Sequence, residues 1–218
     1  MTEIIPALLV QSKEEFEEKL RLVKNDCKIV QVDILDGSLF GNTCWFDAKQ
    51  VGTVESPVAY ELHLMVENPI PIVEQWKEQI PNLKRVIIHA EINRQLGTVI
   101  DHLKNHLKLE VGVALNPETP IEQVRPTLEH IDQLTLMGVH PGSSGQPFEG
   151  DYILEKIKRI HHLYPNIPLQ LDGGVTRELI PALVDAGITR ICGASLLFKA
   201  ENPTKELQSL NNYISTLS

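Results

Sequence analysis

Short apolar runs alternate with segments of helical periodicity from one end of this 218-residue sequence to the other. The apolar runs are rich in Val, Ile and Leu, and their length and β-branched content are typical of strands buried on both faces of a parallel sheet. They lie at residues 3–10, 28–36, 59–66, 85–91, 110–116, 133–139, 168–174 and 190–197.

The segments between these runs carry apolar residues at the spacing of an amphipathic helix. Ser12 is expected to cap the first helix, with Glu15 completing a capping box. Gly187 lies where the C-terminus of a helix favours a left-handed residue. The remaining helices are predicted near 46–53 and over 69–80, 93–107, 119–131, 150–164 and 176–186, with a last helix from about residue 203.

Strand–helix alternation predicts βαβ units in a parallel sheet, and eight such units can close into a (β/α)8 barrel, the TIM-barrel fold. These barrels usually have about 250 residues, so residues 1–218 are predicted to form one compact barrel domain. Any lid must then come from the short loops 37–46 and 140–149. An open doubly wound sheet is the alternative, but it favours a GxGxxG turn after the first strand, and residues 8–12 contain no glycine.

The formal net charge is −9, from 29 acidic and 20 basic residues, which disfavours binding to nucleic acid or to an anionic membrane. A small phosphate can still bind, because a few backbone N–H groups suffice to hold it. No apolar run of about 18 residues is present, and the N-terminus lacks the basic segment of a signal peptide, so a cytoplasmic protein is expected. Cys27, Cys44 and Cys192 are odd in number and far apart, which favours reduced thiols.

Polar and ionisable side chains lie near the C-terminal ends of the predicted strands, where a barrel places its functional residues. Such groups are costly to bury unless they are paired or bind a ligand. Each has a structural alternative: Asp172 could belong to a turn, and a lone histidine such as His89 is more often a core residue than a ligand. Their convergence predicts a site, and its members are Gln31, Asp33, Asp36, His63, Met65, His89, Glu91, Asn116, Met137, His140, Asp172 and Ser195.

Two glycine-bearing loops follow the sixth and seventh predicted strands, at 140–147 and 172–174, and a Gly193-Ala194-Ser195 sequence follows in the eighth. Barrels often bind phosphate with the loops after strands seven and eight. Small residues let backbone N–H groups approach phosphate oxygens closely. Together these segments predict a phosphate clamp.

Seven segments of the sequence resemble the ribulose-phosphate 3-epimerase family, in the family's order and spacing. The segment 63–65 (His-Leu-Met) and the segment 141–146 (Pro-Gly-Ser-Ser-Gly-Gln) are the most specific. The full set is 4–9, 32–37, 61–65, 88–91, 112–117, 139–146 and 171–175, so the resemblance covers nearly the whole chain.

The resemblance implies a phosphate-binding TIM barrel that inverts C3 of a pentulose 5-phosphate through an enediolate. Two aspartates on opposite faces of the substrate move the proton in this family, and they match Asp33 and Asp172. The family's divalent metal is held by these aspartates and two histidines, which match His63 and position 31. The substrate- and phosphate-binding positions match Ala7, Met65, Met137, Gly142, Ser143, Ser144, Gly145, Gln146, Gly173, Gly174, Ala194 and Ser195.

The residues differ from the family pattern at a few positions, two of them in the reaction centre. Gln31 replaces the first histidine, and Ala7 replaces a serine. Leu35 replaces a methionine, and Ser143-Ser144 replaces Phe-Gly. A glutamine carbonyl is a poorer ligand than imidazole for Zn²⁺. The binding of Zn²⁺, Fe²⁺ or Mn²⁺ is therefore expected to be weakened, or absent if Gln31 does not ligate.

Three functions therefore stay open at this stage. The first is a sugar-phosphate 3-epimerase with an altered metal site. The second is a metal-free isomerase, lyase or decarboxylase acting on a sugar phosphate, and the third is a non-catalytic protein that binds a phosphorylated ligand. In each case the expected partner is a small phosphorylated sugar, with neither nucleic acid nor membrane, and a homo-oligomer is compatible with the family.

Overall fold

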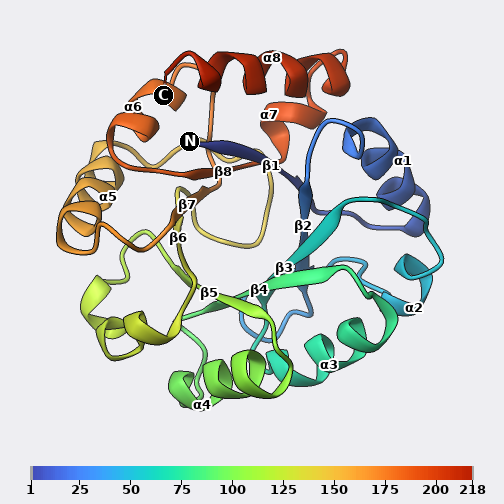
Figure 1. The fold of residues 1–218 in the computed structure, drawn as a ribbon, viewed down its shortest axis with the longest axis horizontal. Helices are drawn as coiled ribbons and strands as arrows, with labels where there is room; N and C mark the ends of the chain where they lie inside the picture. The colour runs from blue at the N-terminus through green and yellow to red at the C-terminus, as the bar shows by residue number, and fades with distance from the viewer. Residues whose placement is uncertain (1, 218) are drawn as a thin grey trace.

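The computed structural model describes residues 2–217 and contains a closed barrel of parallel strands, which confirms the predicted fold (Figure 1). Each strand pairs with the next in the chain, and β8 pairs with β1 to close the ring. The strands are β1 (Glu3–Leu8), β2 (Ile29–Leu35), β3 (Ala59–Met65), β4 (Leu83–His89), β5 (Glu110–Leu115), β6 (Gln133–Met137), β7 (Leu169–Asp172) and β8 (Arg190–Gly193).

The helices form an outer ring around the barrel (Figure 1). They are α1 (Lys13–Val23), α2 (Ala48–Val51), α3 (Pro69–Gln79), α4 (Leu96–Asp101), α5 (Asp151–Leu163), α6 (Ile180–Asp185), α7 (Ser195–Phe198) and α8 (Pro203–Ser215). A π-helical turn, η1 (His102–His106), extends α4, and two 3₁₀ helices, η2 (Ile121–Gln123) and η3 (Arg125–His130), precede β6. No helix within residues 2–217 is long and apolar enough to cross a membrane.

Two segments differ from the sequence prediction. The helix predicted over 119–131 is divided into η2 and η3, because Pro126 has no N–H to donate and cannot lie inside an α-helix. The strand predicted to reach residue 197 ends at Gly193, opposite Pro6 of β1, which also has no N–H. Ala194 then adopts helical dihedral angles, and Ser195 begins α7.

The predicted helix ends are largely confirmed. Ser12 caps α1 by accepting a hydrogen bond from the Glu15 N–H. The Glu15 carboxylate accepts a hydrogen bond from the N–H of Gln11, one residue before the expected donor at the cap. Gly187 follows α6 in the left-handed region, with φ of +101°.

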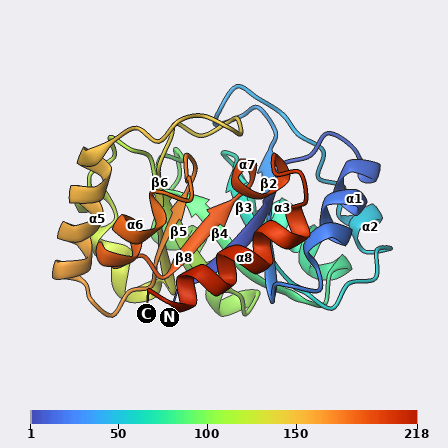
Figure 2. The same ribbon diagram turned by 90° about the horizontal axis from the view of Figure 1, so that it is seen from above.

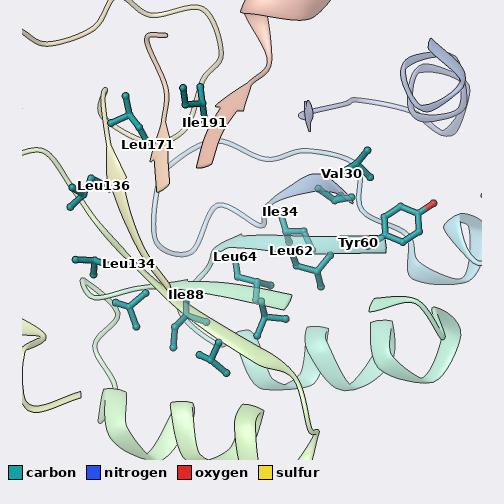
Figure 3. Close-up of a cluster of buried hydrophobic side chains, with 14 of the residues drawn as sticks. Val30, Ile34, Tyr60, Leu62, Leu64, Ile88, Leu134, Leu136, Leu171 and Ile191 are labelled. Carbon is teal, nitrogen blue, oxygen red and sulfur yellow. The ribbon is translucent and has the colours of Figure 1, made fainter. Parts of the chain in front are cut away.

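Alternate residues of each strand face opposite sides of the barrel wall, and the outward side forms the main hydrophobic core. On β2, Val30, Val32 and Ile34 are fully buried against the helices. Figure 3 shows the same arrangement around the barrel, with apolar side chains projecting outward from the strands. Burial of this layer fixes the register of each strand, because a slip of one residue would turn the apolar set toward the barrel interior and the polar interior residues toward the helices.

The inward side is unusually polar for a small barrel, whose interior is dominated by branched apolar residues in other cases. Arg85 is only 2 % exposed, and it pairs with the fully buried Glu61 at 2.6 Å and with Glu110 at 2.9 Å. Further buried amides and a threonine lie in the same interior; they are Gln31, Gln133, Gln170 and Thr135.

The loops that follow β2 and β6 extend over one end of the barrel, opposite the chain termini (Figure 2). They touch where the Asn42 side-chain amide donates to the Gly142 carbonyl at 2.8 Å. These are the loops from which the sequence predicts that any lid must come. The end that they cover is the C-terminal end of the strands.

Candidate active site

A pocket opens at the C-terminal end of the barrel, beneath these loops. The predicted site residues that line it are Asp33, His63, Met65, Met137, Gly142, Ser143, Ser144, Gly145, Gln146, Asp172, Gly173, Gly174, Ala194 and Ser195. Ala7 and Gln31 are buried in the barrel interior instead. Pro141 and Gly193, which belong to the predicted phosphate clamp, also line it. Further lining residues that were not predicted to bind substrate or phosphate are Leu9, Val139, Val175, Cys192 and Leu196.

Asp36, His140 and Asn116 also lie outside this lining, as do His89 and Glu91, which are described below. Asp36 is exposed, and its carboxylate accepts a hydrogen bond from the N–H of the next residue but one at 2.9 Å. The exposed His140 lies 3.5 Å from Glu149 Oε1. Asn116 is buried, and its N–H donates to Glu91 Oε1 at 2.9 Å. These residues therefore shape the neighbouring loops and do not form the reaction centre.

Asp33, His63 and Asp172 meet at the floor of this pocket. The strand register places Asp33 of β2 beside His63 of β3, and Asp172 reaches the same point from the end of β7. The His63 Nδ1 atom lies 3.3 Å from Asp33 Oδ1 and 3.1 Å from Asp172 Oδ2. The three potential ligand atoms lie within 4.8 Å of one another, so this buried group could hold a metal ion.

The Gln31 amide lies among the same three atoms. Its Nε2 atom donates to Asp33 Oδ1 at 2.8 Å and to Asp172 Oδ2 at 2.7 Å, and it lies 3.4 Å from His63 Nδ1. The Gln31 carbonyl oxygen faces the opposite way, where it accepts from Gln170 and Cys192. An amide nitrogen offers protons and no lone pair, so Gln31 does not fit the group as a fourth ligand.

The two carboxylates set the charge of His63. Burial alone would lower the pKa of His63, but hydrogen bonds and charge from Asp172 and Asp33 outweigh it and raise the pKa to about 10. Burial likewise raises the pKa of Asp172, but the hydrogen bond and charge of His63 outweigh it, and the pKa is lowered. The centre therefore holds an imidazolium between carboxylates near neutral pH.

A second histidine supports the first from behind. His89 Nε2 lies 2.9 Å from His63 Nε2, and His89 Nδ1 lies 3.1 Å from Glu91 Oε2. Burial lowers the pKa of His89 to about 4, so its ring is neutral. Since the Glu91 carboxylate only accepts, His89 carries its proton on Nδ1 and accepts through Nε2 from His63. The sequence interpretation assigned His89 no specific role; its spacing from Glu91 was the available signal.

The glycine-rich loops have the backbone conformation that a phosphate clamp needs. Gly142, Gly145, Gly173 and Gly174 all have positive φ. A Cβ on Gly174 would lie 2.6 Å from the Phe148 Cα, so only glycine fits at this turn. Gln146 is predicted to contact phosphate, but its side-chain amide donates to the carbonyls of His140 and Ser143 and thereby braces its own loop.

Gln133 and Gln170, the interior amides that lie behind Gln31, were missed by the sequence interpretation. A signal for them was present, because several strands carry polar residues two positions apart on the inward face. The pairs are Gln31 and Asp33, Glu61 and His63, Gln133 and Thr135, and Gln170 and Asp172. In three of these pairs the residue nearer the start of the strand is the less exposed one, and Gln133 and Thr135 are both fully buried.

Comparison with known proteins gives a family and a fold. Residues 3–198 match the model of the ribulose-phosphate 3 epimerase family. The chain is 30 % identical to the ribulose-phosphate 3-epimerase of Helicobacter pylori over 220 residues, covering 99 % of each chain. It is 28 % identical to that of Schizosaccharomyces pombe, covering 97 % of this chain and 93 % of the relative.

Solved structures with much lower sequence identity share the fold. The 3-hexulose-6-phosphate synthase of Salmonella typhimurium superposes with a TM-score of 0.75 at 11 % identity, covering all of both chains. The protein KGPDC of Streptococcus mutans superposes with a TM-score of 0.75 at 12 % identity, covering 100 % of this chain and 99 % of the other. At such identities, the likeness extends to the barrel architecture alone.

Proposed function

The chain belongs to the ribulose-phosphate 3-epimerase family, and we propose that it inverts C3 of a ketose phosphate, with ribulose 5-phosphate as the first candidate. The family and its named relatives make it a sugar-phosphate epimerase, as the resemblance implies. The observation that carries the finer proposal is the meeting of Asp33, His63 and Asp172 under a glycine-lined pocket.

Inversion at carbon requires a base on one face of the substrate and an acid on the other. Asp33 and Asp172 come from β2 and β7, and each carboxylate contacts Nδ1 of His63 at the pocket floor. On this proposal, one carboxylate takes the C3 proton, and the other, in its protonated form, returns a proton to the opposite face. His63 contacts both carboxylates, so its Nδ1 proton can pass to the group that acts as acid, which leaves His63 neutral.

The enediolate formed between these steps carries negative charge, and preorganised donors stabilise such charge in a buried site. The Gln31 amide is the donor closest to both carboxylates, and it keeps its protons after the His63 Nδ1 proton has passed to the acid. Met65 and Met137 line the pocket with apolar surface beside the reacting carbons, and both are 4 % exposed. These side chains keep water from the centre while it is charged.

The substrate phosphate is proposed to bind the loops after β6, β7 and β8. Gly173, Gly174 and the first turn of α7 bring backbone N–H groups to one wall of the pocket. Gly142 and Gly145 face them from the loop after β6. Neutral N–H donors suffice for one phosphate, which agrees with an acidic protein that binds a small anion.

Asp33, His63 and Asp172 have the composition of a Zn²⁺, Fe²⁺ or Mn²⁺ site. A bound cation of this kind would supply positive charge for the enediolate oxygens. The proposed steps use only protein side chains, because the Gln31 nitrogen lies among the ligand atoms and donates to two of them. The proposed partner is a small phosphorylated sugar, and the proposed location is the cytoplasm. Assembly into a homo-oligomer is compatible with this function.

Solvent exchange tests this function directly. In D₂O, the wild type should place deuterium at C3 of ribulose 5-phosphate and form its C3 epimer, both with added Zn²⁺ or Mn²⁺ and with chelator. Asp33→Asn and Asp172→Asn should each lower the exchange rate by at least about 100-fold, the lower end of the range for a positioned acid or base. Asp185→Asn is a matched control, because Asp185 is exposed at the end of α6.

Folded wild-type protein that exchanges C3 in none of the ketose phosphates tested would contradict the proposal. If such protein still bound the sugar phosphate, a non-catalytic phosphate binder would be favoured. If it cleaved a carbon–carbon bond of the sugar instead, a lyase would be favoured. The Gln31 geometry favours metal-free chemistry for each enzymatic alternative.

A further inference from the structure

The Gln31 amide nitrogen contacts the atoms that would ligate a metal ion, and we propose that it takes the place of that ion. The inference concerns the reaction centre of the proposed function, and its chemical meaning rests on that function. Gln31 is fully buried, and its Nε2 lies 2.8 Å and 2.7 Å from the two aspartate oxygens. A neutral donor thereby holds the two carboxylates together where other members of the family are expected to use a cation.

The orientation of this amide is set by a chain of hydrogen bonds across the barrel interior. Arg190, at the start of β8, donates through Nη1 to the Gln133 carbonyl oxygen. Gln133 Nε2 donates to the Gln170 carbonyl oxygen at 2.9 Å. Gln170 Nε2 donates to the Gln31 carbonyl oxygen at 3.0 Å, so the Gln31 Nε2 faces Asp33 and Asp172.

The direction of the chain follows from its first member. A guanidinium has five N–H donors and no acceptor, so Gln133 must present oxygen to Arg190 and nitrogen to the next amide. Each glutamine then repeats this polarity. The chain starts at the N-terminal end of the barrel and ends at the reaction centre.

A second charged group favours the same direction. Gln170 Nε2 also lies 3.2 Å from Glu61 Oε1, and the other oxygen of Glu61 pairs with Arg85. If the Gln170 amide were turned, its oxygen would face the Glu61 carboxyl group, and the hydrogen bond that its nitrogen now donates would be lost. Arg190 therefore fixes which atom of the Gln133 amide faces it, and Glu61 favours the same orientation at Gln170.

Gln31 could ligate a metal only by turning its oxygen toward the aspartates. Its nitrogen would then face Gln170 Nε2, donor against donor. Turning Gln170 and Gln133 as well would relieve that contact, but it would set the Gln133 nitrogen against Arg190 and the Gln170 oxygen against Glu61. Buried groups left without a partner are costly, and most costly beside charges. The reaction centre is therefore built to bind divalent cations weakly.

Metal affinity, measured without substrate, tests this inference. Gln31→Glu replaces the donor nitrogen with a ligand oxygen in a side chain of the same shape, and it keeps an acceptor for Gln170. Gln31→His, which supplies an imidazole, is the second variant. It is used if the carboxylate introduced by the first substitution prevents folding beside Asp33 and Asp172. Calorimetric titration with Zn²⁺ alone and with Mn²⁺ alone should show affinities at least about 100-fold higher in these variants, because loss of even an outer-shell partner costs about 10–100-fold.

Gln75→Glu is the matched control, since Gln75 is exposed on α3 and the charge change is the same. It should leave metal affinity at the wild-type level. Neutron diffraction of the wild type in D₂O gives an independent result, because deuterons are expected on the Gln31 atom that faces Asp172. An oxygen at that position would overturn the inference.

Stoichiometric metal in wild-type protein purified without chelator would also overturn it, as would Glu and His variants that gain less than about tenfold in affinity. These outcomes are separate from those of the exchange assay. Tight metal binding with C3 exchange would refute the amide's role and leave the epimerase proposal standing. Weak metal binding without any C3 exchange would refute the epimerase proposal and leave the role of the Gln31 amide standing.

Discussion

Gly174→Ala should destabilise the protein and weaken phosphate binding, because this residue lines the pocket and packs directly against the backbone of Phe148. Its φ is +70°, and an added Cβ would lie 2.6 Å from Phe148 Cα and 2.7 Å from Phe148 N. These are backbone atoms, so no side-chain rotation can relieve the overlap. Phe148 belongs to the loop after β6, and displacement of that loop would alter the opposite wall of the pocket.

The magnitude follows from three contributions. A left-handed alanine costs about 1–2 kcal/mol. The reduced freedom of the unfolded chain returns about 0.4–1 kcal/mol, which offsets roughly half of that cost. The overlap decides the result, and overpacking typically costs about 1–3 kcal/mol. We expect a loss of about 2–3 kcal/mol, which corresponds to a fall in Tm of roughly 5–10 °C for a chain of this size.

Urea unfolding and thermal melts would measure the stability change, and titration with inorganic phosphate would measure the binding change. Gly97→Ala is the control, since Gly97 lies in α4 with open space around its Cβ position. That substitution should stabilise the protein by about 0.5–1 kcal/mol. Equal stability of wild type and Gly174→Ala, with unchanged phosphate affinity, would refute this account of the turn.

Three other predictions concern parts of the fold outside the pocket. Arg85→Met should cost about 3–5 kcal/mol in urea unfolding, because it leaves Glu61 buried without its cation, and a loss below about 1 kcal/mol would contradict this. Burial raises the pKa of Cys27 to about 12 and that of Cys44 to about 11. At about pH 8, Ellman's reagent should therefore label these thiols roughly 100-fold more slowly in the native than in the unfolded protein, and the native rate should rise with pH. Equal labelling rates would be inconsistent with burial. Ser12→Ala should cost about 1 kcal/mol in thermal unfolding through loss of the α1 cap, whereas Ser12→Gly should cost only a few tenths.

The fold was predictable because its determinants are local and repeated. Each strand is an apolar run, and each helix between them carries apolar residues on one face, so the alternation could be counted without knowledge of any contact. The failures concern single segments. Pro126 divides a predicted helix into two 3₁₀ helices, and β8 ends at Gly193, where it pairs with Pro6 of β1.

The reaction centre was partly predictable for the same reason. Asp33 alternates with apolar residues on β2, and His63 and Asp172 occupy the same end of their strands, so a parallel barrel must bring them to one rim. The resemblance to a known family identified the same residues and the glycine-rich loops. Neither line of reasoning required side-chain geometry.

The role of Gln31 could not be obtained in this way. The sequence establishes that a glutamine stands at this position, and an amide can either ligate a cation through oxygen or donate through nitrogen. Which of the two faces the aspartates depends on Gln170, Gln133 and Arg190, which lie more than 100 residues further along the chain and meet Gln31 only inside the closed barrel. The sequence alone therefore determined the barrel and placed Asp33, His63 and Asp172 at one rim of it. The tertiary structure decided which atom of the Gln31 amide faces them, because the direction of a hydrogen bond is passed on through contacts that exist only after the ring has closed.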